Sequence, residues 1–286
     1  MTSLAFILVL ISAFCHATWN LLAKRAMGGT TFVWLFSALA TVIYFPVMLT
    51  VVVLQRPHLN TLQLVFIIGS AILHVAYFLL LQQGYRIGDL SLIYPLARGT
   101  GPLLSTIAAI VILGERPSLL ALIGVLSIIG GVFVLVGGLS QISKLSSRSA
   151  ILYAIFTGIF IASYTIWDKY AVSTLLISPI LYDWSSNLTR SLILSPLALR
   201  QWDKVREEWQ LYRREAIGVA VLSSLAYILV LIALTFSPVS HIAPMREMSI
   251  LIGTMMGTHL LSEGNKSRRL LAAGVIVLGV VLLALT

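Results

Sequence analysis

Charged residues are scarce in this chain of 286 residues. They make up 10% of it, whereas soluble proteins contain about 25%. Hydrophobic residues make up 59%, and the mean hydropathy is +0.99. So few polar side chains cannot cover the surface of a soluble domain of this size, and the composition predicts an integral membrane protein.

Residue patterns that carry enzyme chemistry are also missing. The sequence has no His-Glu-x-x-His, no paired Asp motif and no glycine-rich phosphate loop, and its five histidines are scattered. The single cysteine, Cys15, allows no intramolecular disulfide. We therefore expect no catalytic residue, no metal and no cofactor. The net charge of +9 comes mostly from loops, so we expect no nucleic-acid partner.

Apolar runs long enough to cross a bilayer, which needs about 20 residues each, fill almost the whole chain. The sequence predicts ten membrane helices. Their ranges are 3–23, 32–54, 61–83, 90–113, 118–138, 149–171, 175–198, 215–236, 239–261 and 269–286. The charged stretch 201–215 is predicted to be a solvated or interfacial helix.

Two segments half a chain apart place similar residues at similar spacing. They are residues 94–131 and 242–280. In each, an Arg precedes a Glu by 17 positions; the pairs are Arg98 with Glu115 and Arg246 with Glu263. Such duplication is typical of secondary transporters built from repeats, whose site lies between the halves.

The duplication predicts an all-α fold of two five-helix repeats, residues 1–143 and 144–286, in a single transmembrane domain. An odd number of helices per repeat gives the repeats opposite membrane orientations, so we expect inverted repeats around a central cavity. Glycines are expected to let the helices approach closely. They are Gly124, Gly130, Gly131, Gly253, Gly257, Gly274 and Gly279.

Short motifs carry a resemblance to a known family. These are Trp19-Asn20 followed by Lys24, the turn Leu113–Ser118 (LGERPS), and its partner turn Leu261–Ser267. With ten helices in two fives, the chain resembles the EamA-type drug/metabolite transporters. The resemblance implies an exporter or permease of a small metabolite, such as an amino acid or organic acid, acting by alternating access as a monomer or homodimer. The alternative is a multipass enzyme or flippase-type subunit acting on lipid-linked substrates.

Polar residues at membrane depth are costly and tend to face a cavity or a partner. The seventh segment carries Asp183, Asn187 and Arg190 on one helical face. Two interpretations are open: the stripe lines the path of the solute, or Asp183 and Arg190 form a structural clamp.

Two segments combine charges with helix-disrupting residues. Tyr94 and Arg98 lie in the fourth segment near prolines and glycines, and Arg246 and Glu247 follow Pro244 in the ninth. Helices that bend at mid-membrane beside a charge suit a transport site. The alternative is a packing kink with a buried Arg246–Glu247 or Arg98–Glu247 pair.

Aromatic and hydrogen-bonding residues complete the predicted substrate-binding set. They are His16, Trp19, Asn20, His74, Tyr77 and Trp167, with Tyr164 and Asp168 beside the last. Each histidine alone could be a core residue, and the tryptophans could belong to interfacial belts. Together they suit an amphipathic organic solute. Glu115 and Glu263, at helix ends, are predicted to be caps or gate contacts.

The charges predicted at mid-membrane are three arginines (Arg98, Arg190, Arg246) and two carboxylates (Asp183, Glu247). This surplus favours a solute with an anionic group, because the Arg guanidinium binds oxyanions in a bidentate way. The carboxylates and histidines are the candidate carriers if protons are the coupling ion.

Loop charges predict the orientation. The connections after odd-numbered segments hold most of the Lys and Arg, whereas the other face holds Arg56, Arg116 and Lys169. By the positive-inside rule, the richer face is cytoplasmic, with both termini outside. We expect a multipass protein of the plasma (inner) membrane, with the lipid bilayer and a small solute as its partners.

Overall fold

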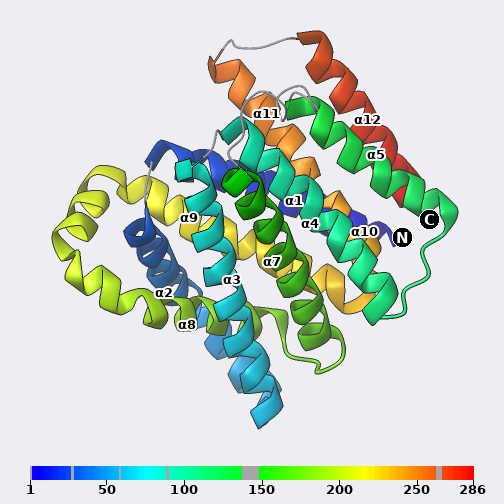
Figure 1. Cartoon of the computed structure of the whole chain (residues 1–286). Coiled ribbons are helices and arrows are strands. Elements are labelled where there is room, and N and C mark those ends of the chain that lie inside the picture. Colours follow the sequence, from blue (N-terminus) through cyan, green and yellow to red (C-terminus); the bar gives the residue numbers. More distant parts are fainter. Residues whose placement is uncertain (1, 27–28, 58, 88–89, 137–147, 262–265) are drawn as a thin grey trace.

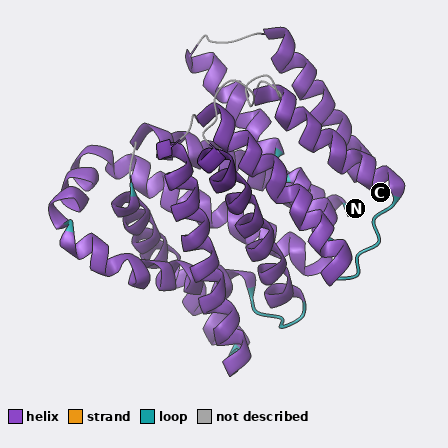
Figure 2. Cartoon of the chain, viewed as in Figure 1, coloured by secondary structure: helices purple, strands orange, loops and turns teal. Residues whose placement is uncertain are grey.

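All secondary structure in the described part of this computed structural model is helical (Figure 2). The structure describes residues 2–26, 29–57, 59–87, 90–136, 148–261 and 266–286. The helices are α1 (Ser3–Ala26), α2 (Thr30–Gln55), α3 (Thr61–Ile87), α4 (Leu90–Ile112), α5 (Leu119–Val136), α7 (Arg148–Ser173), α8 (Pro179–Arg200), α9 (Trp202–Phe236), α10 (Val239–Met245), α11 (Met248–Leu261) and α12 (Lys266–Ala284). Each of the predicted membrane segments is present as a helix or, in one case, as a pair of helices.

Length and hydropathy support membrane insertion. Among the described residues, 5 helical stretches are long and apolar enough to cross a bilayer. They are Ser3–Ala26, Thr30–Gln55, Thr61–Leu81, Ile151–Ser173 and Trp202–Phe236. Shorter apolar stretches lie in α4, α5 and α12. Many large hydrophobic side chains on these helices point outwards, for example Leu54 (77% exposed) and Val111 (75% exposed), as expected where the solvent is lipid.

The packing of the helices repeats when the two halves are exchanged. In chain order, α1, α2 and α3 correspond to α7, α8 and α9, α4 corresponds to α10 and α11 together, and α5 corresponds to α12. The pair α1–α9 has its equivalent in the pair α7–α3, and the pair α4–α7 has its equivalent in the pair α11–α1. α2 meets its own counterpart α8, and α5 meets its counterpart α12; the last pair lies side by side at the upper right of Figure 1. Two copies of one unit that contact each other reciprocally have an approximate two-fold relationship. This is the arrangement predicted for inverted repeats.

The ninth predicted segment is broken in its middle. α10 ends at Met245, Arg246 and Glu247 form a turn, and α11 begins at Met248. Pro244 has no backbone N–H and its ring crowds the preceding turn, which disfavours a continuous helix. The helix is interrupted just after this proline, where the backbone bonds tighten: Glu247 N donates to the Pro244 carbonyl oxygen at 3.0 Å. The bend predicted near these charges is thus a full break, whereas α4 continues without one.

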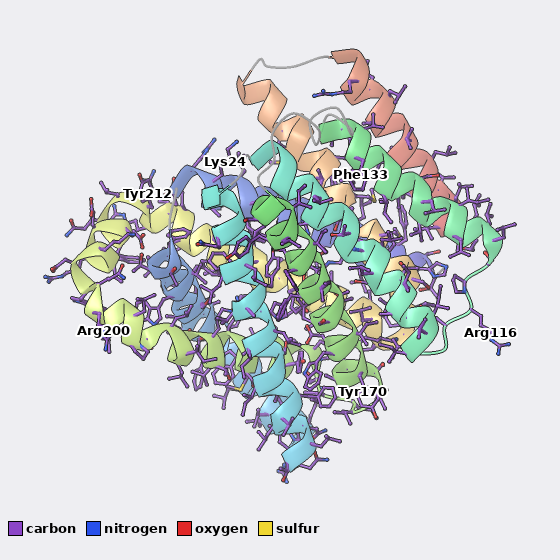
Figure 3. All side chains as sticks on the ribbon, in the orientation of Figure 1. Lys24, Arg116, Phe133, Tyr170, Arg200 and Tyr212 are labelled. Atoms are coloured by element: carbon purple, nitrogen blue, oxygen red, sulfur yellow. The ribbon has the colours of Figure 1, made fainter. Side chains whose placement is uncertain are left out.

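The polar stretch before the eighth segment is continuous with it. Both belong to α9, with a kink at Tyr212 (φ −127°, ψ 27°). The stretch is helical and mostly exposed, as predicted for a solvated or interfacial helix. Two of its residues, Val205 and Glu208, are buried, and Thr31 Oγ1 of α2 donates to Glu208 Oε1 at 2.8 Å. Figure 3 shows Lys24, Arg200 and Tyr212 towards one end of the molecule, and Arg116 and Tyr170 towards the other.

Candidate functional site

Arg98 connects three helices inside the protein. Its Nη2 donates to His16 Nε2 of α1 at 2.8 Å, and its Nη1 lies 3.5 Å from Oε1 of Glu247, the residue just before α11. A guanidinium can only donate, so His16 must accept through Nε2. Arg98 and Glu247 are 8% and 3% exposed, so this ion pair is buried. The Arg98–Glu247 pair considered as one alternative is therefore formed.

The break between α10 and α11 presents two charges with incomplete pairing. Arg246 Cζ lies 5.6 Å from the centroid of the Tyr227 ring, a cation–π distance. Within the described part of the chain, the Arg246 side chain has no hydrogen bond or ion pair. Glu247 Oε2 is buried and has no hydrogen-bond partner among the described residues. The Arg246 guanidinium can therefore donate hydrogen bonds to a further polar group. Glu247 Oε2 can accept one.

Asp168 on α7 is the most buried carboxylate of the network, with 0% exposure. Its Oδ1 accepts the Tyr182 hydroxyl of α8 at 2.6 Å, and its Oδ2 accepts the Tyr227 hydroxyl of α9. His74 Nε2 of α3 lies 4.0 Å from the same Oδ2. Asp168 thus joins α3, α7, α8 and α9, and Tyr227 links it to Arg246.

Aromatic rings cover one side of this network. His74 stacks on Tyr164 with centroids 4.2 Å apart, and Tyr77 meets the edge of Tyr164 at 5.7 Å. His74 also approaches Tyr227 edge-on at 5.3 Å. Tyr164 thus lies between His74 and Tyr77, and His74 lies beside Asp168 and Tyr227.

The polar stripe on α8 (Asp183, Asn187 and Arg190) lies in the same region, and its two charged ends do not pair with each other. Asn187 Nδ2 donates to Asp183 Oδ2 at 3.0 Å and to Ser224 Oγ at 3.1 Å. No direct Asp183–Arg190 ion pair forms within the described residues, and Arg190 Nε is buried without a hydrogen-bond partner among them. Arg190 instead lies within electrostatic range of Asp183, Asp168 and Tyr227.

Three further predicted residues make packing contacts within the fold. Trp167 Nε1 donates to the Phe66 carbonyl at 2.8 Å, and its ring packs between α7 and α3. Asn20 donates to the His16 carbonyl of its own helix at 2.7 Å, and Trp19 packs against the α2–α9 core while touching His16. Tyr94 lies on α4, but its side chain is outside the described residues. The first three therefore have packing contacts that explain their presence.

The charge count from sequence omits Asp168. With this buried carboxylate included, three arginines face three carboxylates, and the positive surplus disappears. Tyr182, Tyr227 and Ser224 also belong to the network and were not predicted. One signal was available for Asp168: it is a charged residue beside Trp167 in the sixth apolar segment. Tyr227 lies in a uniformly apolar run and gives no such signal.

A second polar cluster holds the ends of α9 and α10 together. Glu115 accepts the backbone N–H groups of Val239 (2.7 Å) and Ser240 (2.9 Å) at the start of α10. Lys169 Nζ of α7 donates to the carbonyls of Leu234 (2.6 Å) and Ser237 (3.1 Å). The prediction that Glu115 caps a helix is confirmed, and the capped helix belongs to the other half. Glu263 lies outside the described residues.

An apolar groove lies away from these charges. It has a volume of about 450 Å³ and is lined by Leu80, Ser149, Leu152, Tyr153, Phe156 and Phe160. Leu152 and Phe156 are among the exposed side chains of α7, so the groove faces the surroundings of the bundle. Its lining offers no charged group.

Sequence comparison identifies the two halves. The model of the EamA-like transporter family matches residues 3–137 and, a second time, residues 148–285. The chain belongs to the EamA-like transporter family. No curated protein matches it. Among solved structures, a crystal structure superposes with a TM-score of 0.78 over 100% of this chain and 98% of its own, at 14% identity, which shows a shared fold.

Membership of the EamA-like family makes this chain a multipass membrane transporter. The two family matches fall on α1–α5 and α7–α12, the two sets of helices that pack reciprocally. Arg98 and Arg246 occupy matching places in these sets. Arg98 pairs with Glu247 of the other half, and His74 of the first half lies beside Asp168 of the second. The polar network therefore lies between the repeats.

Proposed function

We propose that this protein is a secondary transporter that moves a small zwitterionic metabolite of the amino-acid type by alternating access. Arg246 carries the proposal. Its guanidinium lies at the break between α10 and α11 and, within the described residues, makes only the cation–π contact with Tyr227. A planar guanidinium with open donors is suited to a carboxylate.

Glu247 supplies the complementary charge. Its Oε2 is buried without a hydrogen-bond partner among the described residues, while Oε1 pairs with Arg98. An ammonium group at Oε2 would satisfy this atom, and the solute carboxylate would lie at the neighbouring Arg246. The balance of three arginines and three carboxylates also favours a solute without net charge over a simple anion.

Alternating access is proposed from the symmetry of the fold. In carriers with inverted repeats, the site lies near mid-membrane, and rocking of one repeat against the other opens it to each side in turn. Helices that are interrupted near the site, such as α10 and α11, are typical of such carriers.

Purified protein and three matched solutes test the proposal. A ligand that binds the folded state raises its melting temperature by mass action. L-leucine should stabilise the protein, whereas leucinol, which lacks the carboxylate, and 4-methylpentanoate, which lacks the ammonium, should not. Arg246→Ala should abolish the shift. Equal stabilisation by leucinol, or by 4-methylpentanoate, would contradict the assignment of a zwitterion.

A further inference from the structure

We propose that His74 and Asp168 form a one-proton site that links solute binding to proton binding. The inference rests on the proposed function only for the identity of the solute. The proton site itself follows from the geometry of the two side chains, which lie on α3 and α7.

The orientation of His74 determines which of its nitrogens faces Asp168. His74 Nδ1 lies 2.9 Å from the carbonyl oxygen of Ser70. A carbonyl can only accept, so Nδ1 carries a hydrogen and donates it. In the neutral ring, Nε2 then carries a lone pair, and it is this nitrogen that lies 4.0 Å from Asp168 Oδ2.

Two acceptors therefore face each other inside the protein. When Asp168 is ionised and His74 is neutral, neither atom can donate to the other. One added proton, on Nε2 or on the carboxylate, converts the pair into donor and acceptor. Closing the gap to a hydrogen bond needs a movement of about 1 Å, because N···O distances in such bonds are about 2.7–3.2 Å.

The surroundings allow both protonation states. The hydroxyls of Tyr182 and Tyr227 donate to the two Asp168 oxygens and satisfy the ionised carboxylate. The polar groups that face the pair come from five elements: Ser70 of α3, Tyr164 of α7, Tyr182, Asp183 and Arg190 of α8, Tyr227 of α9, and Arg246 after α10. The pair is enclosed by its neighbours, since Asp168 is 0% exposed and the His74 side chain is 13% exposed.

Tyr227 connects the proton site to the solute site. Its hydroxyl donates to Asp168, and its ring lies under the Arg246 guanidinium. A solute carboxylate at Arg246 adds negative charge beside Asp168 and so favours the protonated pair. By thermodynamic reciprocity, a proton on the pair strengthens carboxylate binding by the same factor. Solute and proton therefore bind together.

Asp168→Asn is a suitable test variant, because it replaces the carboxylate with an amide of nearly the same size that cannot titrate. The Asn amide can donate to His74 Nε2 while its oxygen accepts a tyrosine hydroxyl, which imitates the protonated pair.

Transport in proteoliposomes separates coupling from binding. With L-serine, L-leucine and L-phenylalanine as probes, wild-type protein should perform counterflow and should accumulate solute when the external solution is more acidic than the lumen. Asp168→Asn should lose the accumulation driven by the pH gradient, and the counterflow that remains should no longer depend on pH. Glu208→Gln changes a buried carboxylate outside the network and should keep both. Accumulation by Asp168→Asn at the wild-type level would overturn the inference.

Infrared difference spectra between acidic and neutral pH test the proton site without a solute. A carboxylic-acid or imidazolium band should be present in wild type and Glu208→Gln, and absent from Asp168→Asn. If Asp168→Asn does not fold, His74→Gln should lose the same band. A spectrum unchanged in these variants overturns the proposal. Absence of counterflow in wild type with all three amino acids would instead contradict the proposed function, while the spectra still decide the proton site.

Discussion

Gly124 of α5 and Gly279 of α12 lie against each other's backbones. A Cβ added to Gly124 would lie 2.8 Å from the Gly279 carbonyl oxygen, and one added to Gly279 would lie 2.6 Å from that of Gly124. Gly131, further along α5, meets the Ala272 carbonyl in the same way. Glycine therefore sets the spacing of the two helices where the repeats meet, as small residues do in membrane helix pairs.

Gly279→Ala should destabilise the α5–α12 contact, because its Cβ would collide with two backbone atoms, which cannot move aside as the end of a flexible side chain can, and with the Ile128 side chain. Overpacking of this kind costs about 1–3 kcal/mol. Gly274→Ala is the matched control on α12, since a Cβ at that position meets nothing within 4 Å. Thermal unfolding in detergent should show a lower melting temperature for Gly279→Ala alone; equal melting temperatures would contradict close packing here.

Glu115→Ala should loosen the start of α10. Glu115 accepts two backbone N–H groups of the other repeat, and the loss of a helix cap costs about 0.5–2 kcal/mol. Arg116→Ala removes a neighbouring exposed side chain that points outwards in Figure 3 and should leave stability unchanged. Thermal unfolding compares the two variants, and equal effects would show that the cap does not contribute.

Arg98→Ala should reduce stability strongly, because it leaves Glu247 as a buried carboxylate without its ion-pair partner. Breaking a buried pair from one side costs about 3–5 kcal/mol. The double variant Arg98→Ala/Glu247→Gln removes the stranded charge and should recover most of the loss. If unfolding measurements show that the double variant is no more stable than Arg98→Ala, the pair is not the reason for the loss.

Loop charges predict which end of the molecule faces the cytoplasm. Figure 3 shows Arg116 and Arg200 at opposite ends. In a Cys15→Ala background, Arg116→Cys should react with an impermeant maleimide added to intact cells, whereas Arg200→Cys should react only after permeabilisation. The reverse pattern would contradict the assignment of both termini to the outside.

Hydropathy predicted the fold well, because a bilayer requires apolar runs of a fixed length and this chain consists mostly of such runs. Residues with a strong local effect on the backbone could also be recognised in the sequence. Pro244 predicted a bend near the place where α10 and α11 are separated. The continuity of α9 through residues 202–215 was not predicted, because charge density signals solvent and does not show that Glu208 reaches Thr31.

The candidate site was predicted only in part. Charges inside apolar helices are conspicuous, so Arg98, Arg246 and Glu247 could be identified. Tyr182 and Tyr227 could not, because tyrosine is common in membrane helices and only the packing of α7, α8 and α9 brings these hydroxyls to Asp168. The stacking of Trp167 on Phe66 could not be predicted either, because only the packing of α7 on α3 brings the two rings together.

The central claim is that Arg246 binds the solute carboxylate between the repeats. Amino-acid counterflow into proteoliposomes measures this most directly, comparing wild type, Arg246→Ala and the exposed control Arg116→Ala. We expect counterflow of L-leucine by wild type and Arg116→Ala, and its loss in Arg246→Ala. The melting temperature of Arg246→Ala should be unchanged, because Arg246 has no ion-pair partner among the described residues that the substitution would leave as an unpaired buried charge. Wild-type rates in folded Arg246→Ala would contradict the account.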